Sequence, residues 1–98
     1  ILAAACAHRT MYARSIQHGQ PLPVAVLNDV EAFTGTVAVR VEGTSILNRE
    51  IDVAAHSAAL VDVPWSALAG YTGRIVTVEL QIGDSPVAKR RLLVPEQS

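Results

Sequence analysis

The sequence predicts an all-β protein, an immunoglobulin-like antiparallel β-sandwich of about seven strands. Three observations lead to this fold class. Apolar and polar residues alternate along several short stretches, as they do in strands with one buried face. Turn-forming residues separate these stretches at intervals of about eight to twelve residues, and no long helical segment lies between them. Parallel β-α-β units are therefore not expected, and a length of 98 residues suits one sandwich domain.

The first part of the chain contains one clear strand after an ambiguous start. Residues 1–13 combine helix-favouring alanine, leucine and methionine with strand-favouring threonine and tyrosine. A turn is expected at Gly19-Gln20-Pro21. Residues 22–28 then alternate and end at Asn28-Asp29, and residues 30–34 are expected to form a loop.

The central part of the chain contains three expected strands. Over residues 36–42, valines occupy one face and mainly polar residues the other, which is typical of a strand that is half buried and half solvated. The turn Gly43-Thr44 leads to a second strand over residues 48–53, and a third strand spans residues 58–63.

The last part of the chain combines one helical turn with a terminal hairpin. Residues 64–70 interrupt the alternation and are expected to form a single helical turn within a connection. A strand over residues 76–82 is joined through Gly83-Asp84-Ser85-Pro86 to a final strand over residues 87–94. Pro95 ends this strand, since proline cannot continue the pairing.

Charge and cysteine content exclude several classes of partner. Eight basic and nine acidic residues give a net charge of −1, so neither a nucleic acid nor a membrane is expected as a partner. The single Cys6 cannot close an internal disulfide, and no N-glycosylation motif is present. These two features indicate a reducing compartment, the cytoplasm. The longest apolar run, Ile1 to Ala7, is too short to span a bilayer.

The chain is interpreted as one domain with a short leading segment. It begins with Ile1 rather than methionine and opens with an alanine-rich stretch. We interpret residues 1–10 as a linker or a remnant of a preceding domain, and residues 11–98 as the sandwich. The apolar residues 1–7 are candidates for a surface that a neighbouring domain covers.

No catalytic, cofactor-binding or metal-binding residue is expected in this chain. His8, His18 and His56 each lack a second ligand at suitable spacing, whereas zinc needs three or four converging ligands. Cys6 lies two residues from His8, but no glycine-flanked turn or oxyanion-hole motif accompanies the pair. A small buried thiol is therefore the favoured interpretation of Cys6.

The acidic residues are also expected to be non-catalytic. Glycoside hydrolysis needs two carboxylates on either side of the sugar bond. Outward positions on a sandwich provide no cleft for such a pair. The acids that occupy outward strand positions or turns are Glu42, Glu50, Asp52 and Glu79 on strands, and Asp29 and Asp84 in turns.

Two further features each have a structural and a functional interpretation. The charge run Lys89-Arg90-Arg91 fits an edge strand protected against pairing with another molecule; the alternative is contact with an acidic partner. Trp65 fits a plug at one end of the sandwich; the alternative is a platform on which a sugar stacks. Aromatic residues make up 4% of the chain, which is few for such a platform.

Five motifs occur in a recognisable order along the chain. They are Met11-Tyr12-Ala13-Arg14, Val26-Leu27-Asn28-Asp29, Gly35 to Val41, Ser57 to Leu68, and Val87 to Pro95. Their order and spacing resemble the C-terminal immunoglobulin-like domain of glycoside hydrolase family 2 enzymes, the β-mannosidases in particular. The resemblance covers most of residues 11–95.

The resemblance implies a function that belongs to a larger enzyme. The chain would be a non-catalytic accessory domain that packs against the catalytic barrel of the same parent chain and stabilises it, with carbohydrate at most peripheral. The parent would be a retaining glycoside hydrolase whose catalytic glutamates lie in a (β/α)₈ barrel outside these 98 residues. The alternatives are a carbohydrate-binding module and a protein-interaction module of fibronectin or immunoglobulin type.

Overall fold

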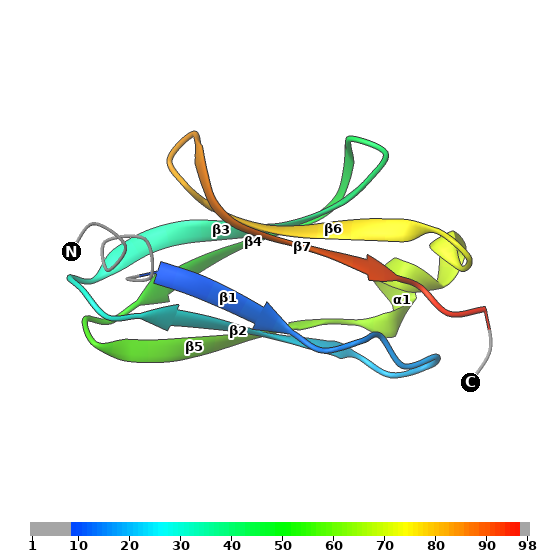
Figure 1. Ribbon diagram of the computed structural model, residues 1–98, viewed down its shortest axis with the longest axis horizontal. Coiled ribbons are helices and arrows are strands. Elements are labelled where there is room, and N and C mark those ends of the chain that lie inside the picture. Colours follow the sequence, from blue (N-terminus) through cyan, green and yellow to red (C-terminus); the bar gives the residue numbers. More distant parts are fainter. Residues whose placement is uncertain (1–8, 97–98) are drawn as a thin grey trace.

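The chain folds into two antiparallel sheets that pack face to face as a sandwich, as the alternation predicts (Figure 1). The computed structural model describes residues 9–96. One sheet has the strand order β1-β2-β5 and the other has the order β4-β3-β6-β7. The strands are β1 (Arg9–Ala13), β2 (Leu22–Asn28), β3 (Phe33–Val41), β4 (Thr44–Val53), β5 (Ser57–Val63), β6 (Ile75–Ile82) and β7 (Ser85–Leu93).

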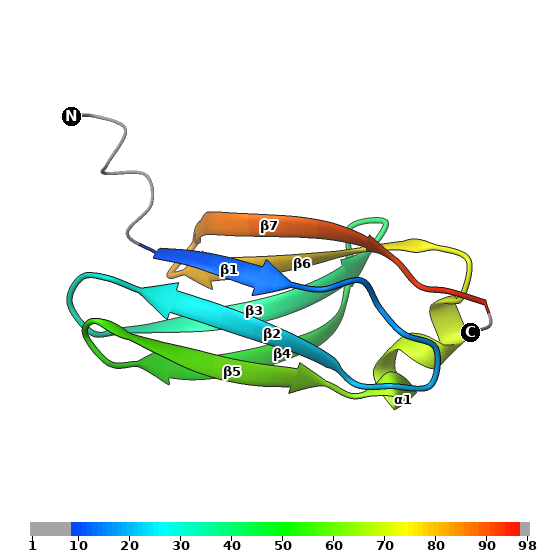
Figure 2. The same ribbon diagram turned by 60° about the horizontal axis from the view of Figure 1, so that its bottom comes forward.

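The topology is immunoglobulin-like with one strand exchanged between the sheets. In a constant-type immunoglobulin sandwich, the fourth strand lies in the same sheet as the first, second and fifth. Here β4 instead pairs with β3 along its length, from Val53 opposite Phe33 to Thr44 opposite Val41. This exchange leaves β5 paired only with β2, at the margin of the three-stranded sheet (Figure 2).

Several segments differ from the sequence-based expectation or settle an ambiguity in it; β4, for example, begins at Thr44 rather than at residue 48, because Thr44 pairs with Val41 instead of forming part of the turn. The ambiguous start is a strand from Arg9 onward, because Met11 pairs with Val26 and is completely buried, which outweighs the helix preference of its neighbours. The loop expected over residues 30–34 ends earlier, since β3 already begins at Phe33, where it pairs with the end of β4.

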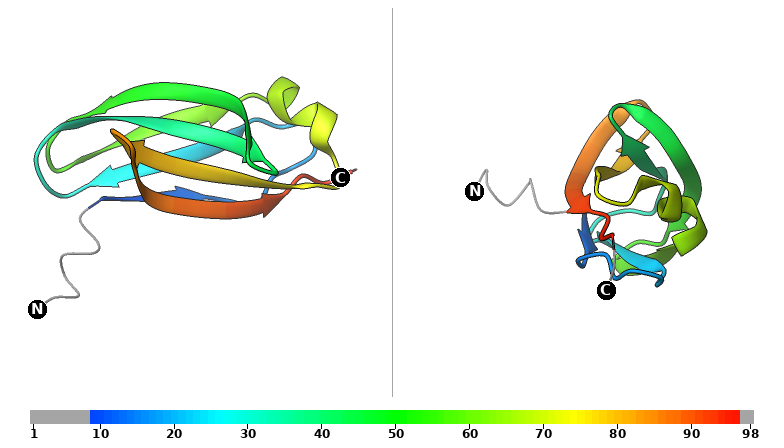
Figure 3. Two further views of the ribbon diagram at one scale, coloured as in Figure 1. Left: turned by 90° about the horizontal axis from the view of Figure 1, so that it is seen from above. Right: turned by 90° about the vertical axis from the view of Figure 1, so that its right-hand side faces the viewer.

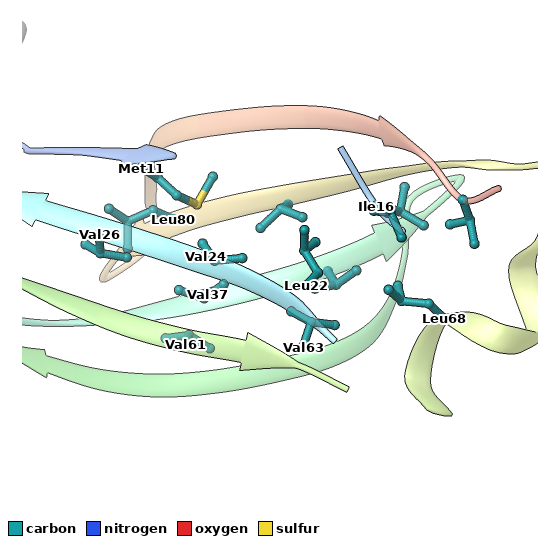
Figure 4. Packing of buried hydrophobic residues seen from close by; sticks show 14 of the residues in the cluster. Met11, Ile16, Leu22, Val24, Val26, Val37, Val61, Val63, Leu68 and Leu80 are labelled. Carbon is teal, nitrogen blue, oxygen red and sulfur yellow. The ribbon is translucent and has the colours of Figure 1, made fainter. Parts of the chain in front are cut away.

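The core consists of aliphatic side chains from the inner faces of both sheets. Seen end-on, the two layers enclose it (Figure 3), and the close view shows the side chains of both layers filling the space between them (Figure 4). The largest fully buried side chains are Met11, Leu22, Val24, Val26, Val37, Val39, Val63, Leu68, Val76, Val78, Leu80 and Val94. Valine dominates this set because its branched side chain suits a pleated, buried surface.

The connection from β5 to β6 contains the helical turn that the sequence predicts. The helix α1 (Trp65–Leu68) starts directly after Pro64, and the 3₁₀ helix η2 (Ala69–Tyr71) continues it. Leu68 is fully buried and, together with Ile16, closes one end of the core (Figure 4). Trp65 is partly buried against the same core, in agreement with its interpretation as a plug.

Two hairpins of the four-stranded sheet bend away from the sandwich (Figure 1). Glu42 and Gly43 form the β3–β4 turn with φ values of 51° and 83°, the two positive values that a type I′ turn needs. The register shifts between Val39 and Arg40, and a second shift occurs in the β6–β7 pair. Such bulges increase the twist and bend the strands. Glu42 is therefore a turn residue, and its expected place on the strand is wrong.

The connection from β4 to β5 holds a residue in a strained conformation. His56 has a φ of 51°, in the left-handed region that non-glycine residues rarely adopt. Its Nδ1 lies 3.4 Å from Oδ1 of Asp29, but both side chains are exposed, so this pair contributes little to stability.

We expect His56→Gly to raise the free energy of unfolding by about 0.5 kcal/mol, because glycine removes the strain at positive φ. Urea denaturation measures the change. The matched control is Ala55→Gly in the same connection, where φ is not positive and added chain entropy should lower stability. A lower stability of the His56 variant would contradict the assignment of strain.

Candidate functional site

The outer face of the three-stranded sheet exposes three large apolar side chains, Tyr12, Leu27 and Leu60. The strand register places Tyr12 beside Ala25 and Ala25 beside Leu60, so these three residues form one row across β1, β2 and β5. Tyr12 is 56% exposed and Leu60 is 75% exposed. A neighbouring row contains Leu27, which is 37% exposed, beside Ala58. We call these five residues the apolar face.

A hollow lies in the apolar face, and the small side chain of Ala25 explains it. Ala25 lies on the central strand between the two large side chains of its row, Tyr12 and Leu60. Ala13, Arg14 and Pro23 complete the lining of the hollow. The site therefore offers an apolar cavity with one basic residue at its border, which fits an inserted aliphatic or aromatic side chain.

The sequence contains a signal for this apolar face that strand alternation alone does not reveal. Residues 22–27 are apolar at every position, not only at every second one. A strand of that kind is typical of burial on both faces. In the structure, Leu22, Val24 and Val26 fill the core, whereas the intervening residues of β2 face outward. The continuous apolar run thus marks β2 as a strand whose outer face also suits contact with a partner.

The outer face of the four-stranded sheet is mainly polar, apart from the exposed pair Ile75 and Leu93, and one of its acids, Glu79, is nearly buried. Glu79 lies between Ala38 and Lys89 on this face, as alternation predicts, but it is only 8% exposed. Glu79 thus lies on the outer face, as expected, but its neighbours shield it from solvent. Its carboxylate oxygens lie 3.8 Å from Nη2 of Arg40 and 3.7 Å from Nζ of Lys89, and the Gln81 amide donates a hydrogen bond to it. These longer side chains cover the carboxylate, which lies between two cationic groups.

The histidines and the lone cysteine do not converge within the described residues. His18 packs against Trp65, with ring centroids 4.7 Å apart and the rings tilted by 56°. His56, in the connection between β4 and β5, lies near Asp29 of the β2–β3 loop. Cys6 and His8 lie outside the described residues, as does the apolar segment 1–7. Within residues 9–96, no group of three or more histidine, cysteine or acidic side chains is placed to hold a metal ion.

The charge run lies on an edge strand, as the sequence predicts. Lys89, Arg90 and Arg91 belong to β7, the last strand of the four-stranded sheet. Arg90 pairs with the buried Val78 and so lies on the inner face of its strand, and its guanidinium reaches to 5.8 Å from the centre of the Tyr12 ring. An inward-pointing charge on an edge strand opposes pairing with a further strand.

Asn28 gives the motif Val26-Leu27-Asn28-Asp29 a structural role. The buried Asn28 amide donates one hydrogen bond to the Glu31 carbonyl (2.9 Å) and another to the Ala54 carbonyl (3.0 Å). Its Oδ1 accepts a hydrogen bond from the Val30 amide (3.2 Å). One side chain thereby joins the β2–β3 loop to the end of β4, so this motif holds the sandwich together at the end opposite α1 (Figure 2).

The fold defines a small β-sandwich domain with an apolar row on the outer face of one sheet and a mainly polar outer face on the other. No protein-family model matches the chain, and no curated protein matches it. Among the described residues, no helix combines the length and apolar character needed to cross a membrane.

Proposed function

We propose that this chain is a non-catalytic accessory domain of a β-mannosidase-like glycoside hydrolase and that it packs against the catalytic barrel of the same parent chain. The observation that carries the proposal is the row Tyr12, Ala25 and Leu60, which leaves two large side chains exposed around a hollow on a solvent-facing sheet. An exposed apolar patch of this kind marks a contact surface.

The energetics of the apolar face suit a permanent contact between domains. Burial of one leucine side chain contributes about 1.5–3 kcal/mol. Leu60 is largely exposed, so most of its surface is available for burial by a partner. The outer layer of a (β/α)₈ barrel is a ring of helices. A leucine or an aromatic residue from one of these helices would fill the hollow above Ala25. Arg14 would then lie at the border of the interface, where charges are tolerated.

The resemblance to glycoside hydrolase family 2 supports the choice of partner. Its motifs coincide with structural features of the sandwich: Asn28 joins two loops, Gly35 lies where β3 approaches β6, and residues 57–68 form β5 and α1. In this proposal the catalytic glutamates belong to the barrel, and this chain supplies no catalytic residue, cofactor or metal ligand. Carbohydrate contacts it at most peripherally.

We expect Leu60→Asp in the full-length parent enzyme to lower the melting temperature of the barrel and to reduce its activity on β-mannosides. The reason is that the interface loses the burial of one leucine, about 2 kcal/mol, and gains a desolvated charge. The matched control is Leu93→Asp on β7, since Leu93 is 55% exposed but lies in the other sheet. The measurements are calorimetry of the parent enzyme and its rate of hydrolysis of a nitrophenyl mannoside.

Two results would overturn the proposal. The first is a barrel whose melting temperature and activity are the same with Leu60→Asp as with the control. The second is binding of mannose or mannobiose to the isolated chain at millimolar concentration, detected by the fluorescence of Trp65, which would favour the carbohydrate-binding alternative.

A further inference from the structure

We infer that the free edge of β5 pairs with β5 of a second copy of this chain, in an antiparallel arrangement centred on Leu60. The inference goes beyond the proposed function, because it concerns the backbone edge of β5 and a second copy of the chain, although Leu60 and Ala58 of β5 also belong to the apolar face. It rests on a comparison of the four edge strands within residues 9–96, which are β1, β4, β5 and β7.

Three of these edge strands carry an arginine on their inner face. Arg9 of β1 pairs with the buried Asn28, Arg49 of β4 pairs with the buried Val37, and Arg90 of β7 occupies the equivalent inner position on its strand. A strand that added to such an edge would have to accommodate this charge beside it, so inward-pointing charges prevent edge-to-edge pairing.

Other protective features occur on the same strands. β1 spans five of the described residues. The pairs of β4 with β3 and of β7 with β6 both contain a register shift, and β7 also carries Pro86 near its start. Short length, bulges and proline each interrupt the regular row of backbone groups that an added strand needs.

β5 has none of these features along its described length. Its register with β2 is continuous over all seven residues. The residues on its inner face are uncharged: Ser57, Ala59, Val61 and Val63. Asp62 is its single charged residue and lies on the outer face. Figure 2 shows β5 at the margin of its sheet. β5 does not pair with the neighbouring edge strand β4, and a hollow lined by Arg49 and Glu50 of β4 and by residues 60–62 of β5 lies between them, although the two strands are also in contact.

The sequence of β5 is compatible with pairing to itself. An antiparallel pair centred on Leu60 places Ala58 opposite Asp62 and Ala59 opposite Val61 of the other copy. No like charges face each other in this register. The two Leu60 side chains lie directly opposite and would cover one another, which shields the most exposed large apolar side chain of the described residues. The resulting two-fold contact joins two three-stranded sheets into one six-stranded sheet.

The test is sedimentation velocity of the 98-residue chain between about 10 μM and 1 mM, the range in which small interfaces associate. We expect a reversible dimer. Leu60→Lys should weaken it at least tenfold, because the two-fold places the two lysines opposite each other. Leu93→Lys on β7 is the matched control and should leave the dimer unchanged. Circular dichroism checks that both variants fold, which their exposed positions favour.

A variant that gains affinity tests the register itself. Ala58→Lys places a lysine opposite Asp62 of the other copy at both symmetric positions, so the dimer should become several-fold tighter. Adding Asp62→Ala to this variant should remove the gain. Amide hydrogen exchange should slow with increasing concentration in residues 57–63 but not in β4 or β7.

Three results would overturn the inference. They are a chain that stays monomeric at 1 mM, a dimer that Ala58→Lys does not tighten, and protection from exchange on another strand. Packing of two copies through the apolar face would also appear as a dimer, but it would give no register-specific gain from Ala58→Lys. These outcomes do not depend on whether the domain packs against a barrel.

Discussion

Gly35→Ala is expected to lower the free energy of unfolding by about 3 kcal/mol. A Cβ atom at Gly35 would lie 2.8 Å from the carbonyl oxygen of Gln81 on β6 and 3.1 Å from the Phe33 ring. The carbonyl belongs to a paired strand, so it cannot move away without disturbing the β3–β6 pairing. For a domain of this size, the loss corresponds to a fall in melting temperature of roughly 15 °C. Urea denaturation and thermal unfolding both measure it.

The matched control for Gly35→Ala is Gly70→Ala in η2. A Cβ atom there would meet nothing within 4 Å, and the φ of Gly70 is not positive. Its substitution should change the stability by less than about 0.5 kcal/mol. If the Gly35 variant were as stable as the Gly70 variant, the close approach of β3 to β6 would not constrain position 35.

The second large effect is expected at Asn28. Asn28→Ala should lower the free energy of unfolding by about 2–3 kcal/mol, because three hydrogen bonds are lost and the carbonyls of Glu31 and Ala54 lose their donor. Asn28→Asp should be at least as harmful, although it preserves size. It retains the acceptor for the Val30 amide but places a second carboxylate oxygen against the two carbonyls.

The control for Asn28 is Asn48→Ala, since Asn48 is exposed on β4 and, within residues 9–96, its side chain only accepts a hydrogen bond from the surface hydroxyl of Ser45. We expect it to change the stability by less than about 0.5 kcal/mol. An Asn28→Asp variant as stable as the unmodified chain would show that the size of the side chain matters at this position and its donated hydrogen bonds do not.

Much of the fold could be predicted from local pattern alone. The alternation of Val37, Val39 and Val41 identifies a half-buried strand, and the same period in residues 76–82 identifies its neighbour in the four-stranded sheet. Period-two patterning works because successive side chains of a strand point to opposite faces. The helical turn after Pro64 also follows from local chemistry, and so does the existence of the β6–β7 turn, although the turn is only Gly83-Asp84 because Ser85 and Pro86 already belong to β7.

The candidate site was much less predictable. Tyr12, Ala25 and Leu60 come from three distant segments, and only the register of three strands brings them into one row. Alternation assigns Glu79 to an outer face correctly but not its burial, which depends on Arg40 and Lys89 from neighbouring strands. Contacts between segments far apart in the sequence leave no local periodic signal.

The sequence by itself determined that this protein is an all-β sandwich, because binary patterning and turn residues act within a few positions of one another. Tertiary structure alone decided that β4 joins the second sheet, that β5 is left at an edge, and that the outer face of the three-stranded sheet carries the apolar row. These features depend on which strands pair and in which register. Each possible pairing is stabilised by side chains from two strands, so the preferred arrangement depends on all seven strands together and cannot be read from one segment.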